Sequence, residues 1–255
     1  MNNRLVDLWN TKTKNDEWWS SFVTAPLAIA ANYFVVDQPW LTPNRITALS
    51  FLVAIISVIF IILGGSINFV AAAGLIHFSH VLDCMDGQMA RFRQVSSLIG
   101  SYYDRLTDQI QVTLWFGAVG YAAYVQSDSV APVFLALIGI AFYGLRGYVK
   151  YVAIEIETAR DPGYPAMIAR LSKVTPIAGL GFNARANIIW FLKEQRKILD
   201  CDEGVFIFIL SAALILDQLE PMLWLFAVSQ VFWGLYWAVK RGKNIQQNIQ
   251  KPIHK

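Results

Sequence analysis

The chain alternates between long stretches of uncharged, apolar residues and short polar segments. A helix needs roughly 17 to 25 residues to cross the hydrocarbon core of a bilayer, so each apolar stretch predicts a membrane-spanning helix. Six are predicted, over residues 46–65, 67–82, 110–125, 130–145, 204–216 and 221–239. The fifth is short, and we expect the third to begin a few turns earlier, among charged residues.

A seventh apolar segment, residues 22–36, precedes these six and contains only about fifteen residues. It includes Pro26 and is flanked by Trp18, Trp19 and Trp40, and tryptophan favours the headgroup region of a membrane. We interpret it as an amphipathic interfacial helix on the inner leaflet. The alternative, a seventh span, would move only the N-terminal tail to the other side.

The predicted fold is therefore an all-α integral membrane protein, with six transmembrane helices preceded by an N-terminal interfacial amphipathic helix. We expect a single domain over residues 1–255. Residues 1–40 form the cytosolic tail and interfacial helix, residues 41–240 the six-helix core, and residues 241–255 a cytosolic tail. Helical pieces are also expected in the long segment 161–203, which proline residues interrupt.

Composition agrees with a membrane protein. Of 255 residues, 56% are hydrophobic and only 15% charged, whereas soluble domains carry about 25% charged residues. The high apolar content excludes a disordered chain, and two cysteines are too few for a disulfide scaffold. The net charge of +3 is small, and no nucleic-acid partner is predicted.

The positions of the basic residues predict the orientation, because Lys and Arg collect in cytoplasmic loops. The turns 64–66, 126–129 and 217–220 contain neither residue, so we assign them to the outer side. The first twenty residues are polar and lack the apolar core of a cleavable signal peptide. We therefore expect both termini on the cytosolic side, most simply of the inner cell membrane.

Ionisable residues that interrupt apolar helices are costly in a bilayer and mark candidate functional sites. Asp83, Asp86, Asp104 and Asp108 lie at the inner ends of the second and third predicted spans. Spacings of three and four residues place each pair on one helix face. Because these two spans are consecutive and antiparallel, we expect the two pairs to face one another.

Four facing carboxylates repel one another unless they are neutralised, and oxygen ligands suit hard cations such as Mg²⁺ or Mn²⁺. We predict a two-metal site that acts on a diphosphate, with these four aspartates as ligands. Gly87 leaves room beside the backbone, Ala90 keeps the next turn small, and Arg91 can bind phosphate. The alternative is that each carboxylate forms a local salt bridge, such as Asp104 with Arg105. Salt bridges can account for any single aspartate, but they account less well for four aspartates at these spacings.

These residues carry a family resemblance. The spacing Asp83-x2-Asp86-Gly87-x2-Ala90-Arg91-x8-Gly100-x3-Asp104-x3-Asp108 resembles the signature of the CDP-alcohol phosphotransferase family of membrane enzymes. Upstream, Thr42-Pro43-Asn44-Arg45-Ile46-Thr47 is similar to the Pro-Asn-x-x-Thr element that often opens the first span in this family.

The resemblance implies roles for individual residues. Asp83, Asp86 and Asp104 would be metal ligands, and Asp108 the general base, which also touches a metal. The CDP moiety would be held by residues of both motifs: Asn44, Asp83, Gly87, Ala90, Arg91 and Gly100. The implied reaction transfers a phosphoalcohol group from a CDP-alcohol to an acceptor hydroxyl, with release of CMP, in phospholipid or polar-lipid headgroup synthesis.

The acceptor is a lipid or an inositol-phosphate-like alcohol on this interpretation. In relatives that use inositol phosphate, basic residues near Arg146, Lys150 and Arg185 bind the phosphate of the acceptor; here they could equally be membrane anchors. A synthase of di-inositol phosphates that uses CDP-inositol and a soluble phosphorylated acceptor is an alternative. Contact with membrane lipids and a homodimer are also expected.

A different class of function, an ion-coupled transporter, could use the same aspartates as an ion site. Such sites usually lie near the bilayer midplane on broken helices, whereas these aspartates lie at the inner edge. The position therefore favours an enzyme.

Overall fold

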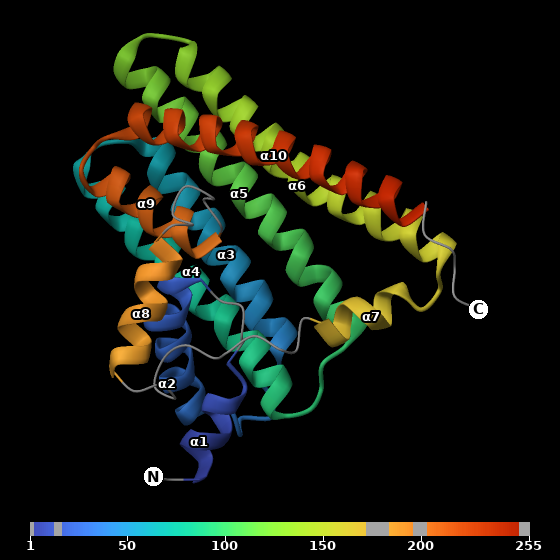
Figure 1. Cartoon of the computed structure of the whole chain (residues 1–255). Helices are drawn as coiled ribbons and strands as arrows, with labels where there is room; N and C mark the ends of the chain where they lie inside the picture. The colour runs from blue at the N-terminus through green and yellow to red at the C-terminus, as the bar shows by residue number, and fades with distance from the viewer. Residues whose placement is uncertain (1–2, 13–16, 172–183, 196–202, 250–255) are drawn as a thin grey trace.

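The computed structural model describes residues 3–12, 17–171, 184–195 and 203–249, and the regular structure in these ranges is entirely helical (Figure 1). The helices in chain order are α1 (Asn3–Asn10), the π-helix η1 (Ser20–Thr24), α2 (Ala25–Val35), α3 (Pro43–Leu63), α4 (Ser66–Phe92), α5 (Leu98–Ser127), α6 (Ala131–Arg160), α7 (Tyr164–Leu171), α8 (Ala184–Glu194), α9 (Glu203–Ile215) and α10 (Leu219–Ile249). The predicted all-α fold is confirmed.

Each of the six apolar segments predicted to span the membrane coincides with a helix, namely α3, α4, α5, α6, α9 and α10. Four of these, α3, α4, α6 and α10, are long and apolar enough to cross a membrane. Helix α5 begins twelve residues before the apolar stretch, among charged residues as expected, and α9 has only 13 residues. The count of six spans therefore stays a prediction.

Helix α3 packs against both α4 and α5, α6 packs against α5 and α10, and α9 packs against α4 (Figure 1). The core between them is aromatic. The ring of Phe116 on α5 stacks on that of Phe226 on α10, with centroids 3.5 Å apart. The indole Nε1 of Trp115 donates to Ser57 Oγ on α3 at 2.8 Å, so this buried polar pair is satisfied.

Two of the turns assigned to the outer side lie together at one end of the bundle. Gln126 Nε2 donates to Asp217 Oδ1 at 2.8 Å across the 126–129 and 217–220 turns. The carboxylates of the candidate site lie near the opposite ends of α4 and α5. The structure thus places these turns and the site at opposite ends of the bundle, as expected if they lie on opposite sides of the membrane.

The N-terminal apolar segment forms the continuous helical stretch η1 and α2, which packs against α4. Asn32 Nδ2 donates to Met85 O at 3.0 Å, and Gln88 Nε2 donates to Ala25 O at 3.0 Å. These bonds join the stretch to the part of α4 that carries Asp83 and Asp86. Leu27 and Phe34 on α2 are exposed, which suits a helix in contact with lipid.

Close packing of α6 on α10 depends on Gly139. A Cβ atom at this position would lie 2.4 Å from Phe226 Cδ1, which is itself stacked on Phe116. We expect Gly139→Ala to lower the free energy of unfolding by about 1–3 kcal/mol because Phe226 has no free space to move into. SDS titration of the purified protein followed by tryptophan fluorescence measures this. Gly117→Ala is the matched control, since its Cβ meets nothing within 4 Å; equal effects of the two changes would contradict the prediction.

Candidate active site

Three of the four predicted metal ligands meet where the C-terminal part of α4 lies beside the N-terminal part of α5. Asp83 on α4 and Asp104 and Asp108 on α5 each offer a carboxylate oxygen, and these three atoms lie within 4.8 Å of one another. All three side chains are half-buried. A group of carboxylate oxygens of this size and burial fits a hard divalent cation.

Asp86, the fourth predicted ligand, lies outside this group of three. Its Oδ2 accepts a hydrogen bond from Thr47 Oγ1 on α3, and the side chain is buried. Thr47 also bonds to Pro43 O one turn earlier, at 3.2 Å. The structure thus places Asp86 beside α3, and a two-metal site that includes it stays a prediction.

Burial and neighbouring charges act in opposite directions on the Asp104 carboxyl group. Asp104 precedes the predicted span 110–125, and burial raises the pKa of its carboxyl group, against the lowering effect of Arg105 and Arg91. A cation between the carboxylates would favour their charged forms. The residues present therefore fit a divalent metal.

The start of α5 brings two of the predicted CDP-binding residues together. Ser97 caps the helix, and its Oγ accepts a hydrogen bond from Gly100 N at 3.0 Å. A Cβ at position 100 would lie 3.4 Å from Asn44 Oδ1, at the start of α3. Asn44 and Gly100 are therefore neighbours although 56 residues separate them in sequence.

The loop before α3 is held in place by Arg93, the residue that follows α4. Arg93 donates to three backbone oxygens of this loop: Nε to Val36 O at 2.7 Å, Nη1 to Leu41 O at 2.7 Å, and Nη2 to Gln38 O at 2.9 Å. Thr42 then caps α3 by accepting from Arg45 N. These bonds set the position at which Asn44 begins the first long helix.

A small cavity of about 200 Å³ lies against the carboxylates. Its lining joins the predicted motif residues to the N-terminal segment: Glu17, Ser20, Ala25, His80, Asp83, Cys84, Asp86, Gly87, Gln88, Arg91 and Asp104. A Cβ at Gly87 would lie 3.1 Å from Arg91 Nη1, so glycine lets the guanidinium lie close to α4. Ala90, Asn44 and Gly100 lie outside this lining.

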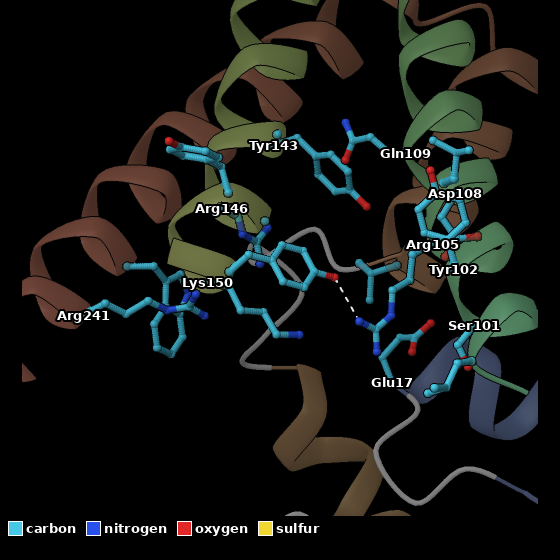
Figure 2. A pocket seen from close by; sticks show the side chains of 18 of the residues that line it. Glu17, Ser101, Tyr102, Arg105, Asp108, Gln109, Tyr143, Arg146, Lys150 and Arg241 are labelled. Atoms are coloured by element: carbon cyan, nitrogen blue, oxygen red, sulfur yellow. Dashed lines mark hydrogen bonds between the residues drawn. The ribbon is translucent and has the colours of Figure 1, made fainter. Parts of the chain in front are cut away.

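A larger cavity of about 1370 Å³ opens between α5, α6 and α10 (Figure 2). Asp108 and Arg105 lie on its α5 side, and Arg146, Lys150 and Arg241 come from α6 and α10. Arg105 Nη1 donates to Tyr151 OH at 3.3 Å, and Arg146 Nη1 donates to the buried Gln230 Oε1 at 2.9 Å. Because Asp108 belongs to the carboxylate group as well, the two cavities meet at those carboxylates.

The structure separates the three predicted acceptor-binding residues. Arg146 and Lys150 line the larger cavity. Arg185, on α8, is exposed and is not part of the lining of either cavity.

Sequence reasoning missed three site residues. Arg105 and Arg241 line the larger cavity, and Glu17 lines both cavities. Glu17 accepts a hydrogen bond from Ser20 Oγ, which also lies 3.0 Å from His80 Nε2. The spacing of Arg105 after Asp104 could have suggested a role, but no signal in the sequence connects Glu17 or Arg241 to the aspartates.

Comparison with known proteins identifies a family whose matched region includes the site residues. The CDP-alcohol phosphatidyltransferase family model matches residues 40–176, which contain both motifs. A comparison with curated proteins finds no match. Among solved structures, Mycobacterium tuberculosis phosphatidylinositol phosphate synthase (PgsA1) with CDP-DAG bound is similar, with a TM-score of 0.55 and 18% identity.

That similarity covers 88% of this chain and 93% of the mycobacterial one, and at this identity it shows a shared fold. The fold likeness, the apolar helices and the family match over more than half of the chain select an integral membrane enzyme over a transporter. The chain belongs to the CDP-alcohol phosphatidyltransferase family, whose members transfer a phosphoalcohol group from a CDP-alcohol to an acceptor hydroxyl and release CMP.

Proposed function

We propose that the acceptor of this transferase is a phosphorylated polyol, held in the larger cavity with one hydroxyl directed at Asp108. The observation that carries the proposal is that Asp108 and four cationic side chains line the same cavity. Three carboxylates, those of Glu17, Asp108 and Glu194, also line the cavity, so the four cations leave it with a net positive charge that suits an anionic acceptor.

The cations surround the cavity from three helices: Arg105 on α5, Arg146 and Lys150 on α6, and Arg241 on α10. Guanidinium groups bind phosphate in bidentate geometry, and each charge-assisted hydrogen bond is stronger than a neutral one. Tyr143, Tyr148 and Tyr151 add hydroxyl groups to the lining. A ligand with both phosphate and hydroxyl groups fits this chemistry.

The donor nucleotide would occupy the smaller cavity, beside Asp83, Gly87 and Arg91. Family members use divalent metals, and Asp83, Asp104 and Asp108 would hold such a cation, which stabilises negative charge on the diphosphate. Asp86 would serve as a further ligand after it rotates away from Thr47.

The reaction follows from where the cavities meet. Asp108 takes the proton of the acceptor hydroxyl, and the oxygen attacks the donor phosphorus on the alcohol side. The new oxygen–phosphorus bond forms as the bond to the leaving phosphate of CMP breaks. Arg91 lies in the smaller cavity, where it can balance negative charge on the departing CMP.

We propose a lipid CDP-alcohol as the donor. The mycobacterial structure of the same fold holds CDP-DAG, and Leu98, at the start of α5, is 94% exposed and also lines the larger cavity. An apolar side chain there can contact a lipid chain that enters from the membrane. CDP-inositol is the alternative donor, and mass spectrometry of the products separates the two.

Removing the charge of Arg146 or Lys150 tests the acceptor proposal. We expect Arg146→Ala and Lys150→Ala each to raise the KM for an inositol phosphate about 10- to 150-fold, since a hydrogen bond to a charged group is worth about 1.5–3 kcal/mol. The KM for the CDP-alcohol should stay within about twofold, because neither residue lines the smaller cavity.

Arg160→Ala on the same helix is the matched control for these variants. Its side chain pairs with Glu157 at 4.0 Å and does not line the larger cavity, so the acceptor KM should not change. If unphosphorylated inositol were used as well as its phosphate, or if all three variants behaved alike, the acceptor proposal would be wrong.

We also propose that the site faces the cytosol at the inner cell membrane and that the protein forms a homodimer. The cationic cavity and the lack of Lys and Arg in the turns 64–66, 126–129 and 217–220 support this orientation. Trp224, Val228 and Phe232 are exposed on one side of α10 at four-residue spacing, where lipid or a second copy could cover them.

A further inference from the structure

Helix α1 packs against the donor side of the site although it precedes the region that the family model matches. Leu8 is fully buried in a core cluster with Ile29, Met85 and Met89, and the last two belong to the same part of α4 as Asp83 and Asp86. At the other end, Arg4 Nη1 pairs with Asp37 Oδ2 at 2.7 Å. The helix is therefore anchored at both ends.

The chain leaves α1 through a fixed turn. Thr11 N donates to Leu8 O at 3.0 Å, and Thr11 Oγ1 donates to the same oxygen at 2.6 Å. Thr11 is itself buried. Its carbonyl oxygen accepts a hydrogen bond from Arg91 Nε at 2.6 Å.

This bond fixes one of the three nitrogens of the Arg91 guanidinium. Nη1 lies 3.1 Å from where a Cβ of Gly87 would be, and both residues line the smaller cavity with Asp83 and Asp86. A guanidinium has five donors in a rigid fork, so fixing Nε to a carbonyl directs the two Nη groups together.

We propose that α1 and the Thr11 carbonyl position Arg91 for binding the nucleotide diphosphate of the donor. Thr11 is a positioning residue, which acts only through Arg91, and the N-terminal segment is thereby a functional part of the donor site. The proposal concerns the CDP part that all CDP-alcohols share, and it does not depend on which acceptor is used.

A thermodynamic cycle separates positioning from a general contribution of α1 to folding. The binding of CDP to the full-length protein in detergent, with Mn²⁺ present, is measured by isothermal titration calorimetry for Leu8→Asp, Arg91→Ala and the double variant. We expect each single change to weaken binding roughly tenfold, about the effect of one charge-assisted hydrogen bond. The double variant should bind no more weakly than Arg91→Ala, because the effect of α1 passes through the missing side chain.

Val6→Asp is the matched control, since it makes the same chemical change on the exposed face of α1 and should leave the affinity within about twofold. A second test, in case Leu8→Asp does not fold, is the removal of residues 1–12. The CDP affinity of this truncated protein is measured with Arg91 present and with Arg91→Ala. Unchanged CDP affinity in the α1 variants would overturn the proposal. So would an equal loss with and without the Arg91 side chain.

Discussion

At saturating metal, Asp108→Asn should lower kcat by about three orders of magnitude while the affinity for CDP stays within about twofold. General-base catalysis contributes roughly 10²- to 10⁴-fold, and asparagine keeps the shape of the side chain but cannot accept the proton. Asp108 belongs to the group of three carboxylates and also lines the cationic cavity. Its loss should therefore affect the chemical step more than donor binding.

The measurement is the single-turnover rate of CMP release from a CDP-alcohol in detergent. Asp128→Asn is a suitable control because it makes the same chemical change at the other end of α5, in a left-handed turn residue that asparagine also tolerates. Retention of more than about a tenth of the rate by Asp108→Asn would remove this residue from the role of base.

Removing divalent cations should have the second large effect. We expect excess EDTA to reduce CMP release to background and Mg²⁺ or Mn²⁺ to restore it, because Asp83, Asp104 and Asp108 lie close together and repel one another without a cation. Asp104→Asn should raise the metal concentration for half-maximal activity about 100-fold or more, since it would remove one of the proposed ligands.

Asp86→Asn distinguishes one metal from two. If Asp86 leaves Thr47 to bind a second ion, inductively coupled plasma mass spectrometry should find about two Mn²⁺ per chain in the wild type and about one in the variant. The same metal content in both proteins would limit the site to the three carboxylates that the structure brings together. Activity that persists in EDTA would contradict any metal site here.

The sequence was sufficient to locate the six long apolar segments as helices, although not α1, and most of the carboxylates. Uncharged stretches predict the helices because a membrane imposes length and polarity on each span, and the 83–108 spacing places paired aspartates on helix faces. The helical pieces expected in segment 161–203 are confirmed as α7 and α8, and the early start of α5 is confirmed too. These are properties of single segments, which local periodicity determines.

Contacts between distant segments could not be predicted in this way. Spacing does not show that α3 packs against both α4 and α5, so the hydrogen bond that holds Asp86 to Thr47 was not foreseen. Arg241 joins the larger cavity only because α10 packs along α6. Arg185 was grouped with Arg146 by charge alone, and the lining of the cavity does not include it.

The N-terminal segment shows the same limit. Its polar residues predicted a cytosolic tail, and nothing in their order indicated that Thr11 would contact Arg91 or that Glu17 would line both cavities. Such contacts depend on the packing of η1 and α2 on α4.

Product analysis with purified protein is the most direct test of the function. CDP-diacylglycerol, CDP-inositol, CDP-choline and CDP-ethanolamine are each combined with inositol phosphate, inositol or glycerol phosphate, with Mg²⁺ or Mn²⁺, and products are identified by mass spectrometry. We predict CMP and a phosphodiester product from CDP-diacylglycerol with a phosphorylated polyol, and much less with the unphosphorylated one. Intact donors in every combination, with either metal, would contradict the transferase function.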